Sequence, residues 1–89
     1  MPAPRGYIMR ISVKFMSRLR TLAGAEEVDV ELPEDATVTK LLDSLREPYP
    51  SIFPLVQQAM IMVNHKIVAP EAVLCDGDRV MLLQIVAGG

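Results

Sequence analysis

The sequence predicts one small α+β domain in which a mixed β-sheet wraps around a single main helix. Two kinds of periodicity support this: apolar and polar residues alternate near both ends of the chain, and a helical period lies between them. A third observation is the length of 89 residues, which allows one hydrophobic core but not two. The predicted order of elements is strand, strand, helix, strand, strand, strand.

The first two strands are predicted from alternation. In residues 8–16, Arg10, Ser12 and Lys14 each lie between apolar neighbours, which indicates a strand with one buried face. Residues 17–22 follow, and Gly24 then suits the end of a helical turn or a wide connection. In residues 28–32, apolar and acidic side chains alternate again, which indicates a second strand. Because they are close in sequence to the first strand, we expect the two to pair antiparallel.

The main helix is predicted over residues 38–46. Its apolar residues recur at the spacing of one helix face: Val38, Leu41, Leu42 and Leu45. Thr37 is the expected N-cap, without a capping box because Lys40 stands where that motif has glutamate. Pro48 ends the helix at residue 47 or before.

The second half of the chain supplies the remaining strands. Residues 49–58 are interrupted by prolines and predict one short helical turn that adds Ile52, Phe53 and Leu55 to the core. Residues 60–63 and 67–68 predict two strands joined by a tight turn at 64–66. Residues 79–86 predict a last strand, apolar enough to lie mid-sheet with both faces largely covered. The expected core contains Val13, Phe15, Val30, Leu41, Leu45, Ile61 and Leu83.

Composition excludes several classes of protein. The net charge of −2 lacks the basic surplus of a nucleic-acid binder, so no nucleic-acid partner is expected. No apolar run approaches the ~20 residues of a membrane span, and residues 1–6 contain no signal-peptide core. We therefore expect a cytoplasmic protein without a membrane partner. The single cysteine excludes an internal disulfide and a cysteine-based zinc cluster.

Few side chains are candidates for catalysis. His65 is best interpreted as an exposed turn histidine, since no nucleophile or orienting partner is evident. Cys75 has acidic neighbours, which favours a structural over a reactive cysteine. The segment 76–78 lacks the rest of a calcium loop, so no metal site is predicted.

The methionines are expected to fill the core. A cluster of acids is expected to form a solvated face, with docking of a basic partner as the alternative: Glu26, Glu27, Asp29, Glu31, Glu34 and Asp35.

The two ends differ from the body of the chain. Residues 1–7 hold two prolines and no apolar pattern, so we expect a disordered leader, a domain over 8–87, and a tail at 88–89. Gly88 and Gly89 lack Cβ atoms and can follow a channel too narrow for side chains. Such a tail presents only its carboxylate. Another protein must activate that group, for example as an acyl-adenylate, before a sulfur nucleophile can form a thiocarboxylate.

Several short motifs together resemble a known family. They are VKF at 13–15, LRTLAG at 19–24, LPEDATVTKLL at 32–42, YP at 49–50, VN at 63–64, DGDRV at 76–80 and VAGG at 86–89. On these motifs, residues 9–89 resemble the small subunit of molybdopterin synthase, within the ubiquitin-like β-grasp sulfur carriers. The resemblance implies a β-grasp fold with a flexible Gly-Gly tail.

The resemblance also implies a function. Gly89 would be adenylated by a ubiquitin-activating-type adenylyltransferase that uses ATP, then thiocarboxylated with sulfur from a sulfurtransferase. Gly88 would thread the tail into a large molybdopterin synthase subunit, in a heterotetramer, where the sulfur forms the dithiolene of a pterin. The chain would bind no cofactor and would have no catalytic site of its own.

The sulfur acceptor stays open at this point. Many molybdopterin carriers have a proline pair where this chain has Gln84-Ile85. Carriers for thiamine or tRNA thiolation are similar in fold and tail, although thiamine carriers are usually shorter, so length favours the molybdopterin type. A ubiquitin-like modifier joined to lysines of other proteins would need the same tail and the same activation.

Overall fold

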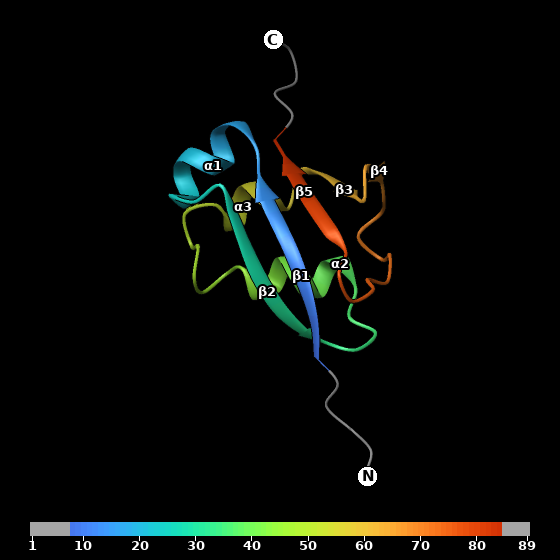
Figure 1. Cartoon of the computed structure of the whole chain (residues 1–89). Helices are drawn as coiled ribbons and strands as arrows, with labels where there is room; N and C mark the ends of the chain where they lie inside the picture. The colour runs from blue at the N-terminus through green and yellow to red at the C-terminus, as the bar shows by residue number, and fades with distance from the viewer. Residues whose placement is uncertain (1–7, 85–89) are drawn as a thin grey trace.

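The computed structural model describes residues 8–84 (Figure 1). The predicted leader at 1–7 and the Gly88-Gly89 tail lie outside the described residues, as do residues 85–87 of the predicted domain. The elements in chain order are β1 (Ile8–Phe15), α1 (Ser17–Ala23), β2 (Glu27–Pro33), α2 (Val38–Ser44), α3 (Phe53–Val56), β3 (Met60–Val63), β4 (Lys66–Ile67) and β5 (Arg79–Leu83).

The strands form a mixed sheet in the order β2-β1-β5-β3-β4. β1 pairs in parallel with β5, whereas its pairing with β2 is antiparallel, as are the pairs of β3 with β4 and β5. In Figure 1 helix α2 crosses behind the sheet, on the connection between β2 and the later strands. The α+β prediction is therefore confirmed, and β5 is the central strand as expected.

Local chemistry explains the helix boundaries. Helix α1 confirms the predicted helical turn and ends at Gly24, whose φ of 74° and N–H bond to the Arg20 carbonyl form a left-handed cap. Thr37 caps α2 as predicted, because its hydroxyl accepts a hydrogen bond from the Lys40 N–H at 3.3 Å. Helix α2 ends at Ser44, two residues before the predicted end.

The core lies between the sheet and helices α2 and α3. Five of the seven predicted core residues are buried: Val13, Phe15, Leu41, Leu45 and Ile61. The segment around α3 does reach the core, but mainly through Ile52 and Val56, both fully buried. Val56 was not predicted, and the expected Phe53 and Leu55 are only half-buried against the core.

Two predictions about strands are wrong. Val80 and Leu82 are buried on one face of β5, whereas Met81 and Leu83 are half-buried on the other, so the two faces that were expected to be largely covered are covered unequally. Leu83 was therefore assigned to the wrong face, and Leu82 takes its place in the core. Val30 is half-buried because it lies on β2, the strand at the end of the sheet order.

The β3–β4 turn follows the predicted chemistry. Asn64 and His65 both have positive φ, at 52° and 72°, as a two-residue hairpin turn requires. Strand β4 begins at Lys66, one residue earlier than expected. Among residues 8–84, no helix has the length and apolar character needed to cross a membrane.

Candidate functional site

The predicted site residues Gly88 and Gly89 lie outside the described residues, so the structure places only the strand that leads toward them. Strand β5 ends at Leu83. On one side Leu82 is in register with Phe15 of β1, and on the other Leu83 is in register with Met60 of β3. The Leu82 carbonyl also accepts a hydrogen bond from the Met16 N–H at 3.0 Å. The tail is therefore attached to a strand that is held on both edges.

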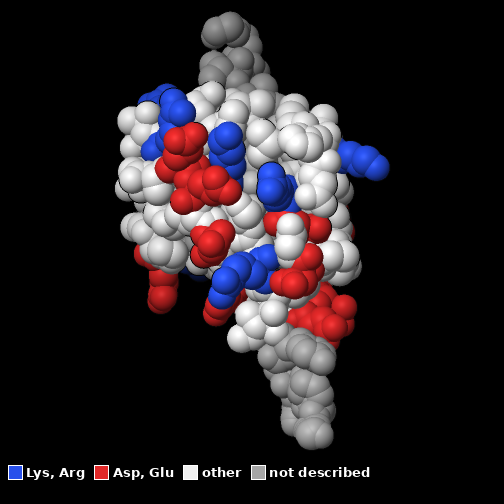
Figure 2. All heavy atoms as spheres, viewed as in Figure 1, with Lys and Arg blue, Asp and Glu red and all other residues white. Residues whose placement is uncertain are grey.

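The sheet face opposite α2, here called the outer face, has two chemically different halves. Its apolar half consists of side chains that alternate with the buried ones on β3, β4 and β5: Met60, Met62, Ile67, Met81 and Leu83. Ile67 is 67% exposed, and the other four are half-buried. Figure 2 shows a largely uncharged area over these strands. Exposed apolar patches of this kind mark interaction sites.

This distribution corrects the expectation that methionines fill the core. Among residues 8–84 only Met9 is a buried methionine, at 5% exposure. Met60, Met62 and Met81 instead lie on the outer face. Because methionine is unbranched and flexible, it suits a surface that adapts to a partner. Residues 80–83 are all apolar, so alternation in the sequence did not mark this face.

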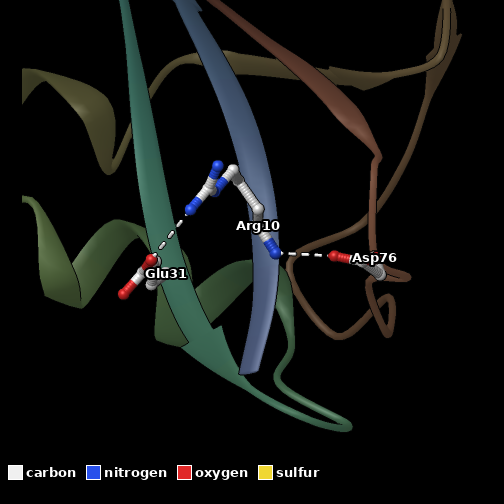
Figure 3. Close-up of polar contacts among 3 residues, drawn as sticks. All are labelled: Arg10, Glu31 and Asp76. Carbon is white, nitrogen blue, oxygen red and sulfur yellow. Dashed lines mark hydrogen bonds and ion pairs between the residues drawn. The ribbon is translucent and has the colours of Figure 1, made fainter. Parts of the chain in front are cut away.

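The other half of the outer face is polar. Arg10, Ser12 and Lys14 of β1 are in register with acidic residues of β2. The Arg10 guanidinium forms an ion pair with Glu31 at 3.3 Å (Figure 3). All six acids at 26, 27, 29, 31, 34 and 35 are exposed, as a solvated face and a docking surface for a basic partner would both require. Within the described part of the chain, no group of three or more His, Cys, Asp or Glu is arranged to hold a metal ion.

The turn at 76–78 uses its carboxylates to hold the fold together. Asp76 Oδ1 accepts a hydrogen bond from the Arg10 N–H at 2.7 Å (Figure 3). The Gly77 N–H donates to the Arg10 carbonyl at 3.0 Å. Asp78 accepts from the Cys75 N–H at 2.8 Å and from the Asn64 side-chain amide at 3.0 Å. These bonds attach the start of β5 to β1 and to the β3–β4 turn, a link that the sequence did not reveal.

His65 and Cys75 are both exposed. The exposed turn position predicted for His65 is confirmed, and its side chain lines a shallow depression together with Lys14 and Arg79. Cys75 lies in the turn before β5, where its backbone N–H is bonded to Asp78. Its thiol is on the surface rather than packed in the core.

Comparison with known proteins supports one family. A model of the ThiS family matches residues 13–89. A molybdopterin synthase sulfur carrier subunit from Mycobacterium tuberculosis is 39% identical over 64 residues, covering 72% of this chain and 75% of the relative. A protein of the same name from Chlamydomonas reinhardtii is 28% identical over 83 residues, covering 91% of this chain and all of the relative.

Solved structures agree on the fold. SAMP1 from Haloferax volcanii superimposes with a TM-score of 0.81 at 26% identity, over 90% of this chain and 99% of that one. The BexX/CysO complex of Amycolatopsis orientalis contains a chain with a TM-score of 0.69 at 28% identity, covering 89% of this chain and 99% of its own. A designed protein based on ubiquitin has a TM-score of 0.63 at 17% identity, over 91% of this chain and 93% of its own. The chain therefore belongs to the ThiS family and has the ubiquitin-like β-grasp fold.

Proposed function

We propose that this chain is the sulfur carrier subunit of a molybdopterin synthase, and that the carboxylate of Gly89 carries the sulfur. The observation that most supports the proposal is the family match, which runs from residue 13 to residue 89 and so includes both terminal glycines. The relatives from Mycobacterium tuberculosis and Chlamydomonas reinhardtii carry this name.

The proposed loading reaction proceeds in two steps on another protein. In the first, a Gly89 carboxylate oxygen attacks the α-phosphorus of ATP, and pyrophosphate leaves. In the second, a sulfide-level nucleophile supplied by a sulfurtransferase attacks the acyl carbon. A C–S bond forms, the C–O bond to AMP breaks, and a thiocarboxylate remains. The adenylyltransferase binds the ATP, so this chain contributes the carboxylate and the narrow glycine tail but no bound cofactor.

The outer face supports docking beside the tail. Met81 and Leu83 belong both to the apolar half and to β5, the strand that leads toward Gly88 and Gly89. A large synthase subunit that covers this half would bury the apolar side chains and lie next to the base of the tail. We propose that this subunit receives the tail in its active site, within a heterotetramer.

The loading step is tested with the purified chain, ATP, the cognate adenylyltransferase and a sulfur source. Intact-protein mass spectrometry follows the replacement of one oxygen by sulfur. The unaltered chain should convert, and a reaction without ATP should not. Deletion of Gly89 should abolish conversion because the carboxylate then ends one residue short of the nucleotide. Gly88→Val should also fail, because a β-branched side chain blocks a channel shaped for glycine.

Both variants need a folding control. Gly88 and Gly89 lie beyond the last strand, so thermal unfolding of each variant should match that of the unaltered chain. Efficient conversion of the Gly89 deletion would contradict the proposal. A failure of the unaltered chain to convert with a verified cognate enzyme would contradict it equally.

Docking is tested by hydrogen exchange on a complex with the cognate large subunit. Amides of β3 and β5 should gain protection if the apolar half is covered. Protection confined to residues 49–58, on the connection that contains α3, would oppose docking at the outer face.

A second candidate function is attachment to lysines of other proteins. The similarity to SAMP1, named small archaeal modifier protein 1, favours it. This function uses the same tail and the same activation, and differs in the acceptor. Affinity purification of the chain from its own cells, followed by peptide mass spectrometry, separates the two: a thiocarboxylate without lysine adducts identifies the carrier, and isopeptide-linked lysines identify the modifier.

A further inference from the structure

Two basic side chains on the outer face lack an acidic partner within the described part of the chain. Lys14 lies on β1 and Arg79 at the start of β5. Among residues 8–84 the ion pairs are those of Arg10 with Glu31 at 3.3 Å and of Arg46 with Asp43 at 3.4 Å. Lys14 and Arg79 are therefore outside the ion pairs of the described residues, although the whole chain has a net charge of −2.

The neighbouring carboxylates are bonded to other groups. Glu27 is in register with Lys14, but its carboxylate accepts a hydrogen bond from the Ser12 hydroxyl. Asp78 precedes Arg79 in sequence, but its two oxygens accept from Asn64 and from the Cys75 N–H. Neither acid forms an ion pair with Lys14 or Arg79. The two basic side chains are therefore available to a carboxylate from outside the chain.

One depression of about 160 Å³ on the outer face is lined by Lys14, His65 and Arg79, together with Glu27, whose carboxylate is bonded to the Ser12 hydroxyl. The depression shares Met81 with the apolar half, because Met81 is in register with Lys14 on one side and with Met62 on the other. Figure 2 shows basic side chains beside the uncharged area of this face. The apolar surface is thus continuous with a depression that is lined by two basic side chains and one acid.

We propose that this depression receives an aspartate or glutamate side chain of the partner that docks on the apolar half. The inference rests on the proposed function, which supplies that partner as the large synthase subunit. Because adjacent strands lie about 4.8 Å apart, the partner's carboxylate should lie roughly 5–10 Å from the apolar side chain that it places on Met62 and Met81.

This arrangement would also set the orientation of the partner. The two cations attract an acidic side chain over β1 and β5, whereas the exposed acids of β2 repel the same side chain if the partner is displaced toward that edge. Charge complementarity of this kind accelerates association and suppresses wrong registers. The apolar half would then provide contact area, and the depression would set the orientation of the partner on the sheet.

The test measures affinity of the cognate large subunit for charge-reversal variants. Lys14→Glu and Arg79→Glu should each weaken binding by about 5- to 30-fold at low salt, and should reduce its salt dependence. Lys40→Glu is the matched control, because Lys40 is exposed on α2, away from the outer face. Each variant changes the net charge by −2, from −2 to −4, so bulk charge is the same in all three.

A zero-length cross-link adds a direct readout of the contact. A carbodiimide activates a carboxylate so that it forms an amide, with no spacer, with an amine that can reach it directly. Peptide mass spectrometry of the treated complex should therefore find Lys14 linked to an aspartate or glutamate of the large subunit. Lys14→Arg keeps the charge but has no amine, so it should retain affinity and lose the cross-link.

The outcomes separate this inference from the proposed function. If the unaltered chain binds and both outer-face variants bind as well as Lys40→Glu, the carboxylate site is wrong and the carrier function stands. If the complex forms without any cross-link from Lys14 to the large subunit, no carboxylate of the partner lies against Lys14 and the inference is overturned. If the unaltered chain neither binds the large subunit nor accepts sulfur, the carrier proposal fails and this inference fails with it.

Discussion

Replacing each of two adjacent leucines of β5 by alanine should separate folding from docking. Leu82 is fully buried beneath the sheet, whereas Leu83 is half-buried on the outer face. The two side chains are chemically identical and differ by one position in the strand. Leu82→Ala should therefore destabilise the domain, and Leu83→Ala should mainly weaken binding of the large subunit.

The magnitudes follow from burial. Leu82→Ala removes three buried carbons and leaves a cavity, so the free energy of unfolding should fall by about 2–5 kcal/mol. At Leu83 water fills the vacated space and no cavity forms. With about 0.8 kcal/mol for each fully buried carbon and only partial burial, that loss should stay near 1–1.5 kcal/mol. A domain of this size loses about 4–8 °C in unfolding midpoint for each kcal/mol.

The assay is urea unfolding monitored by circular dichroism, since the chain contains no tryptophan whose fluorescence could report unfolding. The two variants should share one m-value and differ in midpoint. Binding of the large subunit is then measured below the unfolding transition of each. Leu82→Ala should retain the affinity of the unaltered chain, and Leu83→Ala should bind about tenfold more weakly, as expected for a central apolar contact.

Equal losses of stability in the two variants would refute the assignment of faces to β5. Unchanged binding by Leu83→Ala, with its fold intact, would show that the apolar half is not the docking surface. Leu83→Met is a useful companion, because it conserves volume and should restore most of the affinity.

Three further predictions concern stability and use the same urea unfolding assay. Thr37→Ala should lower the free energy of unfolding by about 1 kcal/mol, because the hydrogen bond to the Lys40 N–H is lost, and Thr37→Ser should restore it; equal values for the two variants would contradict the cap. Gly24→Ala should destabilise by about 1 kcal/mol through its φ of 74° alone, since an added Cβ meets no atom within 4 Å; an unchanged midpoint would refute the backbone argument. Deletion of residues 1–7 should leave the midpoint within a few degrees, and a larger drop would make the leader part of the fold.

Much of the fold was predictable because it depends on local chemistry. Alternation set the first two strands, the spacing of Val38, Leu41 and Leu45 set the main helix, and Thr37 and Gly24 marked a helix start and a helix end. Each of these signals acts within a few residues. The resemblance to sulfur carriers also came from sequence alone, and the family match confirmed it. The roles of Gly88 and Gly89, the leader and the cytoplasmic location stay predictions.

The tertiary structure decided which side chains face the partner. Residues 80–83 are all apolar, so no polar residue among them marks the outer face, and the burial of Val80 and Leu82 rather than Met81 and Leu83 depends on pairing with β1 and β3. The same pairing turns the methionines of β3 and β5 outward and brings Lys14 next to Arg79, residues 65 positions apart in sequence. Register between distant strands is a long-range property. For that reason the sequence alone determined the elements and the family, and the sheet decided the surface on which a partner can act.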